Sequence, residues 1–455
     1  MAKRTTARSR LDEMVADLRS DISSGKRAEG EFLPSELDLG ELYSISKNTV
    51  RKGLDQLVAD GFIEKVPRIG ARVLRKKQET GERLRFGYYS SLDAETELLK
   101  LVERFNEAQS DIQVEPIPVG YPRNRESMAQ YLNEGMYFDV MTINLYNFDF
   151  ASADSPDKSA LEPFDVRDDL YPFLNAPFTS GGRQYALPFV FTPVILYYNK
   201  EHFREVGLSE PNSGWTWDNL SEAADKLAAG KERLGFYFHL MSENRWPIFL
   251  LQNGVRFERK ADGRYDLCNP LVKESLETCM GIVDKHFPSH LSENDGDVVS
   301  LFLRGKVSMV MASYSHLHAM KEAPFEYDIA PLPHLREVKT ILVSIGLAVN
   351  KSSTRKAAAK RFVDYLLSYE TQLHIRRHTL NLPSLRKAAE WVDAEGDTHT
   401  PYRFHMYREL IHTFRTYADL NLTALELTAI RDEMRFYWSK LDDLDTVLKR
   451  LEEKL

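Results

Sequence analysis

The first 74 residues place short apolar stripes between polar breaks, a pattern that predicts three helices and a hairpin. Apolar side chains recur at helical spacing over 10–24 and predict an amphipathic helix there. Ser35 is placed to cap a second helix, and Ser46 to cap a third that closes at Gly61. Residues 62–74 predict two short strands around a turn. Three helices and a β-hairpin form the layout of a winged helix-turn-helix.

The third predicted helix has an apolar face and begins with short polar or cationic side chains. Such groups suit phosphates and the edges of bases. The unpaired N–H groups and the dipole at the start of a helix also favour phosphate. We therefore expect this helix to contact DNA through its first turns, with Ser46, Lys47, Asn48, Thr49 and Arg51.

Beyond residue 85 the hydrophobic pattern changes to strand-length apolar runs that alternate with helical periods. Strand candidates at 83–91, 112–120 and 138–146 alternate with helix candidates at 93–109 and 126–135. This β-α-β-α-β order predicts a mainly parallel sheet with helices on its faces.

The two patterns are separated by a charged, apolar-poor stretch, so we expect more than one domain. A chain of 455 residues exceeds the size at which a single hydrophobic core keeps growing. The expected parts are a winged helix-turn-helix DNA-binding domain over 1–77, a linker over 78–85 and an α/β domain over 86–455.

Charge and cysteine usage narrow the class of protein. Residues 1–77 hold 16 Lys and Arg against 12 Asp and Glu, whereas the rest holds 44 against 56. A basic front on an acidic body fits a small module that binds a polyanion. The two cysteines are too few for a disulfide framework. The first 20 residues lack the apolar run of a signal peptide, and no window approaches the roughly 20 apolar residues of a membrane span. We therefore expect a cytoplasmic protein.

Four motifs in the order and spacing of residues 10–74 resemble the GntR family of bacterial winged-helix regulators. They are Leu33-Pro34-Ser35-Glu36, Ser46-Lys47-Asn48-Thr49-Val50-Arg51, Asp60-Gly61-Phe62-Ile63 and Gly70-Ala71-Arg72-Val73. The resemblance implies that a homodimer binds double-stranded operator DNA. The residues that it implies at the DNA are Ser35, Ser46, Lys47, Asn48, Thr49, Arg51, Arg68 and Gly70.

Three positions depart from the GntR pattern. Leu37 stands where members of the family usually have an arginine, and Lys47 replaces the arginine that follows the serine of the recognition helix. Because an ammonium is a point charge rather than a bidentate fork, base discrimination at Lys47 is expected to be looser. Arg68 replaces a glycine of the wing and adds a cation that could reach phosphate or the minor groove. These departures bear on which operator is bound.

Residues 86–455 resemble the extracellular solute-binding proteins of sugar-type ABC transporters. The segments that carry the resemblance are 182–211, with its Leu-Pro and Tyr-Tyr-Asn-Lys pieces, the Thr-Trp helix at 216–227, and the Gly-Lys strand entry at 302–314. The resemblance implies a type II periplasmic-binding-protein-like domain, in which two α/β lobes close over a solute by a hinge motion.

A ligand in such a domain would lie just past the carboxyl ends of strands, where open α/β sheets bind ligands. An aromatic face can stack on the C–H face of a sugar, and polar side chains satisfy its hydroxyls. A lone Tyr or Trp is otherwise more often part of a core or of a lobe interface. With that alternative open, the candidate ligand-binding residues are Tyr89, Asn144, Tyr146, Phe191, Arg245, Trp246, Tyr314 and Ser344.

Other chemistry finds little support in the sequence. His316 and His318 are two residues apart and have no Cys or carboxylate at useful spacing, so no metal or other cofactor is expected. No catalytic motif such as Gly-x-Ser-x-Gly or a P-loop occurs, so no enzyme is expected. Apolar residues from 427 to 455 recur at spacings of three and four, which fits either a dimerising coiled coil or helices packed on the second lobe.

Together these patterns predict a ligand-responsive bacterial transcription regulator that senses a small solute, a mono- or oligosaccharide, between two lobes. One alternative is a transport receptor for sugars whose DNA-binding module is vestigial. A second alternative is an enzyme of carbohydrate metabolism on the same fold, which lacks a visible catalytic constellation.

Overall fold

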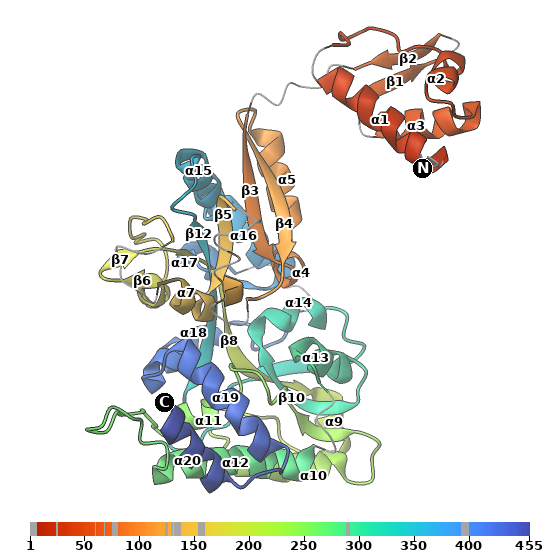
Figure 1. Ribbon diagram of the computed structural model, residues 1–455. Coiled ribbons are helices and arrows are strands. Elements are labelled where there is room, and N and C mark those ends of the chain that lie inside the picture. The colour runs from red at the N-terminus through yellow and green to blue at the C-terminus, as the bar shows by residue number, and fades with distance from the viewer. Residues whose placement is uncertain are drawn as a thin grey trace. The chain divides into compact units, whose positions relative to one another are not determined.

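The computed structural model describes residues 7–23, 26–59, 61–67, 69–74, 81–122, 126–128, 131, 138–152, 160–287, 292–392 and 400–455. Its backbone divides into two compact units, Met1–Glu82 and Arg83–Leu455, each of which is described by itself (Figure 1).

The first unit contains the helices and the hairpin of a winged helix-turn-helix. Its elements are α1 (Ala7–Ser23), α2 (Glu36–Leu42), α3 (Lys47–Ala59), β1 (Ile63–Val66) and β2 (Gly70–Val73). The strands β1 and β2 pair antiparallel, with Ile63 opposite Val73. The helices and strands enclose one small aliphatic core that includes Met14, Leu39, Val50, Leu57 and Ile63.

Local sequence explains where the helices of this unit begin. The Ser35 hydroxyl accepts a hydrogen bond from the backbone N–H of Asp38 at 3.2 Å, and the Asp38 carboxylate accepts one from the N–H of Ser35. This reciprocal arrangement is a capping box. Ser46 accepts from the N–H of Thr49 at the start of α3. Gly53 lets α3 approach α1 closely, because a Cβ there would overlap Met14.

A ten-stranded mixed sheet organises the second unit. Its main order is β4-β3-β5-β12-β8-β10-β9, in which β3 is parallel to β5 and β9 is parallel to β10. The central β8 and β12 pair antiparallel with each other and with their outer neighbours β10 and β5. The strands are β3 (Glu82–Tyr89), β4 (Ile112–Val119), β5 (Val140–Asn144), β8 (Leu187–Asn199), β9 (Leu234–Tyr237), β10 (Val307–Ser313), β11 (Tyr327–Ala330), β12 (Thr340–Val349), β13 (Leu382–Pro383) and β14 (Phe414–Arg415), and a separate hairpin joins β6 (Thr179–Ser180) to β7 (Arg183–Gln184).

Two lobes form around this sheet, and β8 and β12 run through both (Figure 1). Leu187 and Phe189 of β8 pack into the core of the first lobe, and Leu196 and Tyr198 into the core of the second. A third apolar cluster, which includes Phe191 of β8 and Leu342 of β12, covers the crossing strands. The two lobes therefore have separate cores joined by continuous strands.

Helices cover both lobes. The first lobe has α4 (Ser91–Thr96), α5 (Leu98–Ala108), α7 (Leu145–Ser152), α15 (Lys356–Leu366) and α16 (Tyr369–Thr379). The second lobe has α9 (Lys200–Glu205), α10 (Trp217–Ala228), α11 (Pro247–Gln252), α12 (Pro270–His286), α19 (Ala424–Trp438) and α20 (Leu444–Lys454). The third cluster takes in residues of α8 (Pro172–Asn175), α13 (Asp295–Leu303), α14 (Leu317–Met320), α17 (Arg386–Ala389) and α18 (Tyr407–Leu410).

The predicted elements are largely present, with two differences in the first lobe. The single helix expected over 93–109 is two helices, because Glu97 between them adopts a left-handed conformation (φ 53°). Salt bridges of Glu97 to Lys100 and His374, both at 2.8 Å, accompany this break. The strand expected over 138–146 ends at Asn144 and continues directly as α7. Of the helix expected over 126–135, the structure describes 126–128 and 131 as helical, and the rest lies outside the described residues.

The C-terminal apolar repeat packs on the second lobe, as one of its two interpretations required. Leu427, Ile430 and Met434 of α19 and Leu448 and Leu451 of α20 lie in the core of that lobe. Most of the repeat therefore packs within the chain, whereas Leu441 remains exposed.

Candidate functional site

The start of α3 presents a cationic, polar surface in the first unit. Lys47, Asn48 and Arg51 are exposed, whereas Val50 between them is buried. The alternation leaves the polar side chains of the first turns facing away from the core. The structure therefore places these three predicted DNA contacts on one accessible stretch of helix.

Glu36 of α2 holds the two cations of this surface. Arg51 donates from Nε to both carboxylate oxygens of Glu36, at 3.0 and 2.9 Å, and Lys47 Nζ lies 3.7 Å from the same carboxylate. The hydrogen bond from Arg51 lowers the pKa of Glu36. Glu36 therefore orients the guanidinium before any phosphate is bound.

The remaining predicted DNA contacts divide between capping and the hairpin. The hydroxyls of Ser35 and Ser46 cap α2 and α3, and Thr49 Oγ1 lies 2.8 Å from Ser46 Oγ. Gly70 opens β2 with φ 145°. Arg68 lies outside the described residues. The capping hydroxyls remain at the helix starts, where backbone N–H groups can also reach phosphate.

In the second unit, Tyr146 lies between the lobes. It lies in the first turn of α7 in the first lobe, and its ring packs against the cores of both lobes. Its ring centroid is 5.1 Å from that of Phe150 and 6.1 Å from that of Tyr417, both nearly perpendicular. Burial raises the pKa of Tyr146, and its hydroxyl oxygen is buried without a hydrogen-bond partner among the described residues. A buried hydroxyl of this kind is a natural place for a ligand hydroxyl.

Charged side chains of the second lobe lie near this tyrosine. Arg431 of α19 donates from Nη1 to Glu243 and from Nη2 to Asp432, the latter at 2.7 Å. Burial raises the pKa of Tyr146 most, Glu243 raises it further, and Arg431 opposes the shift. Tyr146, Glu243, Arg431 and Asp432, here called the interlobe cluster, offer hydrogen-bond donors and acceptors from both lobes. Such a set can satisfy the hydroxyls of a polyhydroxyl ligand.

Tyr89 and Asn144 are in contact with each other in the first lobe, and Asn144 ends β5 two residues before Tyr146. Tyr89 is fully buried, its ring lies 4.2 Å from that of Tyr121, and its hydroxyl accepts a hydrogen bond from the N–H of Asn144 at 3.2 Å. Asn144 Oδ1 accepts from the N–H of Asn147 at 2.7 Å and so shapes the start of α7. These contacts position Tyr146.

Arg245 and Trp246 are interior residues of the second lobe. Both side chains are fully buried. Arg245 Nη2 lies 2.6 Å from Asp295 Oδ2 and donates to Ser313 Oγ at 3.1 Å. The indole of Trp246 packs edge-on against Trp438, with ring centroids 5.8 Å apart. The structure therefore gives both side chains packing partners within the chain.

Phe191, Tyr314 and Ser344 lie at the crossing strands. Phe191 and Tyr314 belong to the third apolar cluster, and the Tyr314 hydroxyl donates to the carbonyl of Phe404. Ser344 donates to the carbonyl of Val190 at 3.3 Å. Of the eight candidate ligand residues, Tyr146 belongs to the interlobe cluster. Asn144 and Tyr89 are close to Tyr146 in the first lobe.

Sequence reasoning missed Glu243 and Arg431, which are 188 residues apart and meet only in the fold. The one available signal for Glu243 was its place two residues before Arg245 in the segment that follows β9. No sequence signal marked Arg431, because it lies in a helix whose apolar repeat indicates only packing.

Glu95, on the helix that follows β3, carries a prediction about pH. Burial raises its pKa to about 7, although a hydrogen bond with Ser91 opposes the shift. A carboxyl whose pKa is raised in the fold stabilises below its unfolded pKa and loses that contribution as the pH rises through 7. We expect Glu95→Gln to be more stable than the wild type at pH 8 by about 1–2 kcal/mol, a value reduced for solvent screening because Glu95 is partly exposed.

Urea unfolding of wild type and Glu95→Gln at about pH 4 and at about pH 8 measures this difference. The two proteins should be nearly equally stable at the lower pH, which lies below the unfolded pKa of the carboxyl. Asp93 is partly exposed on the same helix, and the Asp93→Asn variant serves as the matched control. Equal stability of Glu95→Gln and wild type at pH 8 would show that Glu95 ionises normally.

The fold is a two-lobe α/β domain on one chain with a winged-helix unit. The family model of bacterial extracellular solute-binding proteins matches residues 89–373, and that of the bacterial regulatory proteins of the gntR family matches residues 11–73. The chain therefore belongs to the bacterial extracellular solute-binding protein family and carries a GntR-family domain before it.

Individual relatives agree with this assignment. The sn-glycerol-3-phosphate-binding periplasmic protein UgpB of Salmonella typhimurium is 22% identical over 338 residues, which cover 68% of this chain and 76% of UgpB. A putative binding protein of Brucella abortus is 25% identical over 225 residues, 47% of this chain and 54% of that protein.

Solved structures show the same fold. An ABC substrate-binding protein from Listeria monocytogenes in complex with cycloalternan has a TM-score of 0.68 at 19% identity, over 82% of this chain and 98% of that chain. A solute-binding protein from Thermotoga lettingae bound with α-D-tagatose has a TM-score of 0.70 at 18% identity, with the same coverage. These values confirm the predicted α/β solute-binding fold.

No helix in the described ranges has the length and apolar character that a membrane crossing requires. Within the same ranges, no group of three or more His, Cys, Asp or Glu side chains is placed to hold a metal ion.

Proposed function

We propose that the protein is a ligand-responsive transcription regulator that binds operator DNA through its first unit and a carbohydrate or related polyol at the interlobe cluster. The observation that carries the proposal is the presence of both machineries on one chain: an exposed cationic helix start in a GntR-family unit, and a buried tyrosine hydroxyl flanked by charged groups of a second lobe. Neither family performs catalysis in this proposal, and no cofactor is needed.

The ligand class is inferred from the chemistry of the interlobe cluster. A hydroxyl, two carboxylates and a guanidinium suit a ligand rich in hydroxyl groups. The similar solved structures named above hold cycloalternan and α-D-tagatose, and UgpB is an sn-glycerol-3-phosphate-binding protein. All three compounds are polyhydroxyl compounds. Because Arg431 is already paired with two carboxylates, the cluster favours a neutral sugar or polyol over a phosphate ester.

Regulation would follow from closure of the lobes on the ligand. GntR-type winged helices act as homodimers on two-fold-related half-sites, so a change in the ligand-binding domains would alter how the two DNA units fit the operator. The ligand can shift DNA affinity only by its differential affinity for the two states, typically about 1–3 kcal/mol or roughly 5–150-fold. We propose the cytoplasm as the site of action, where DNA is accessible.

Titration of DNA binding with sugars tests this function. The full chain is bound to a labelled fragment of its own promoter region, and the affinity is measured with increasing concentrations of a panel of mono- and oligosaccharides. We expect at least one sugar that binds the protein to change DNA affinity within the range above. A sugar that binds tightly and leaves DNA affinity unchanged would refute the regulatory part.

Arg51 supplies a prediction for the DNA-binding surface. Arg51→Ala removes an exposed guanidinium that Glu36 orients, and we expect it to weaken binding to all DNA sequences by about tenfold. Because one phosphate contact is lost, the slope of log affinity against log salt should fall by about 1. Fluorescence anisotropy at several salt concentrations measures both quantities.

The matched control for Arg51 is another exposed cation of the same unit. Lys26→Ala, in the segment after α1, should leave both affinity and slope unchanged. An unchanged salt slope for Arg51→Ala would place Arg51 away from the DNA backbone.

A transport receptor with a vestigial DNA unit is the second candidate, because the sequence relative with the broadest match named above is a periplasmic binding protein. Cell fractionation separates the two functions: recovery of the protein outside the cytoplasm would favour the receptor.

A further inference from the structure

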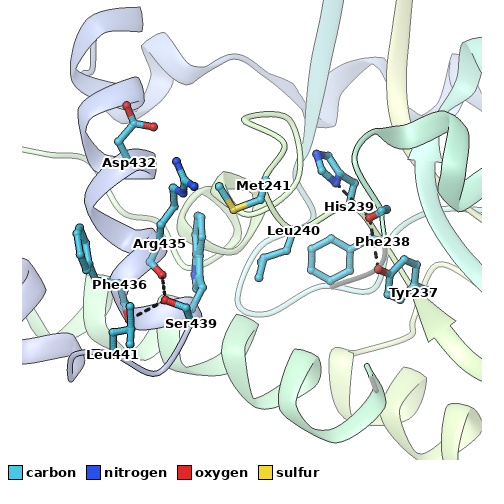
Figure 2. Close-up of a pocket in the computed structure, with 12 residues that line it drawn as sticks. Tyr237, Phe238, His239, Leu240, Met241, Asp432, Arg435, Phe436, Ser439 and Leu441 are labelled. Carbon is cyan, nitrogen blue, oxygen red and sulfur yellow. Dashed lines mark hydrogen bonds between the residues drawn. The ribbon is translucent and has the colours of Figure 1, made fainter. Parts of the chain in front are cut away.

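A cavity of about 460 Å³ lies in the second lobe, next to the interlobe cluster. It opens at the carboxyl end of β9, between residues 237–241 and the C-terminal half of α19 (Figure 2). Its volume falls within the roughly 300–1,000 Å³ of small-molecule pockets. The lining residues are Tyr237, Phe238, His239, Leu240, Met241, Ser292, Asp432, Arg435, Phe436, Trp438, Ser439 and Leu441.

The walls of this cavity are mainly apolar. Phe238, Leu240 and Trp438 are buried, while Phe436 and Leu441 at its edge are 42% and 72% exposed. In Figure 2, Leu240 and Phe238 lie across the space from the residues of α19. Large apolar side chains that are exposed together at the edge of a cavity often mark a binding site.

The polar groups on the β9 side of the cavity satisfy one another. His239 Nδ1 lies 3.1 Å from Ser292 Oγ, and the Tyr237 hydroxyl donates to the same oxygen at 3.4 Å. Burial lowers the pKa of His239 and so favours its neutral ring. The polar atoms of this wall therefore have partners without a ligand.

The cavity and the interlobe cluster draw residues from the same two elements, α19 and the segment after β9. Asp432 lines the cavity and also pairs with Arg431 of the cluster. Arg431 and Arg435 are one helical turn apart on α19, at a typical Cβ separation of about 5–6 Å. The segment after β9 supplies cavity residues at 237–241 and then Glu243 of the cluster. The cavity therefore adjoins the interlobe cluster at Asp432.

We propose that the cavity receives an apolar, preferably aromatic, substituent carried by the ligand of the interlobe cluster, so that the effector is a glycoside with an apolar aglycone. This inference rests on the proposed function. A further sugar unit would leave hydroxyls unsatisfied against Phe238, Leu240 and Trp438, which is costly. An aromatic ring gains from burial against the same side chains and from edge contacts with Trp438.

Paired glycosides test the proposal. Isothermal titration calorimetry on the full chain compares methyl and phenyl β-D-glycosides of glucose, galactose and mannose. For any sugar that binds, the phenyl glycoside should bind at least tenfold more tightly than the methyl glycoside. Equal affinities for the two members of every binding pair would overturn the inference.

Two cavity variants locate the effect. Ser439→Trp fills the cavity from an exposed position, and Leu441→Glu places a charge at its edge. Both should abolish the preference for phenyl while leaving the affinity for the methyl glycoside unchanged. Leu425→Glu, which is also exposed but lies at the other end of α19, should behave as wild type. A preference that persists in both cavity variants would place the phenyl group elsewhere and refute the proposal.

The free aromatic compound 2-naphthol separates failure of this inference from failure of the proposed function. If no glycoside binds, the proposed sugar sensing fails, and 2-naphthol binding that is lost in Ser439→Trp still supports an aromatic site in the cavity. Absence of 2-naphthol binding to the wild type would overturn the cavity site whatever the sugars do. Tyr146→Phe should weaken both glycosides of a pair equally, because it alters only the interlobe cluster.

Discussion

Trp246→Ala is expected to destabilise the second lobe by about 3–5 kcal/mol. The indole is fully buried in the core of that lobe and packs edge-on against Trp438. Truncating a buried Trp to Ala removes its transfer free energy and leaves a cavity that the surroundings fill only in part. The midpoint of urea-induced unfolding, followed by circular dichroism, should therefore fall sharply.

A matched substitution distinguishes packing from ligand contact at this position. Trp246→Phe retains an aromatic ring and should recover more than half of the lost stability, since a smaller volume is removed. A Trp246→Ala variant of normal stability that binds a sugar poorly would instead make Trp246 a ligand contact. DNA binding should stay intact in both variants, because the first unit has its own core.

The winged helix could be predicted from sequence because its signals are local. Caps at Ser35 and Ser46, a glycine at the end of α3 and a short hairpin each fall within a few residues of the element that they define. The predicted GntR resemblance and the α/β class of the larger unit are confirmed by the family matches and by the solved structures. Local sequence signals therefore predict the fold of the first unit and the α/β class of the second.

The break at Glu97 shows where local reasoning stops. Helical periodicity runs without interruption through 93–109, yet Glu97 is held in a left-handed conformation by partners that include His374, 277 residues away. The same limit applies to the change from β5 to α7, which carries Tyr146 between the lobes. Contacts between distant segments decide such details, and no periodicity encodes them.

Residue type does not say where a candidate ligand residue will lie, for a related reason. Arg245 and Trp246 suit a sugar by chemistry, and the fold buries both in the second lobe, where Arg245 pairs with Asp295 and Trp246 packs on Trp438. Glu243, two residues earlier, pairs with Arg431 of α19 and contributes to raising the pKa of Tyr146 in the first lobe. Which neighbour in a short segment reaches the space between the lobes depends on how the segment leaves β9, and that follows from packing.

The pair of Arg245 and Asp295 yields the second large effect. Arg245 is fully buried, its Nη2 lies 2.6 Å from Asp295 Oδ2, and burial lowers the pKa of the guanidinium. Asp295→Ala would leave an uncompensated buried cation, so we expect a loss of about 3–5 kcal/mol in the free energy of unfolding. Urea unfolding at pH 7 measures this loss.

A double-mutant cycle shows how much of that loss belongs to the pair. Arg245→Met removes the charge while keeping an elongated side chain, and the double variant with Asp295→Ala should be more stable than Asp295→Ala alone. Losses that simply add would mean that the two side chains do not depend on each other. Arg245 also donates to Ser313 at the end of β10. A strong coupling would therefore indicate that the pair of Arg245 and Asp295 helps to hold the segment that carries Glu243 in place.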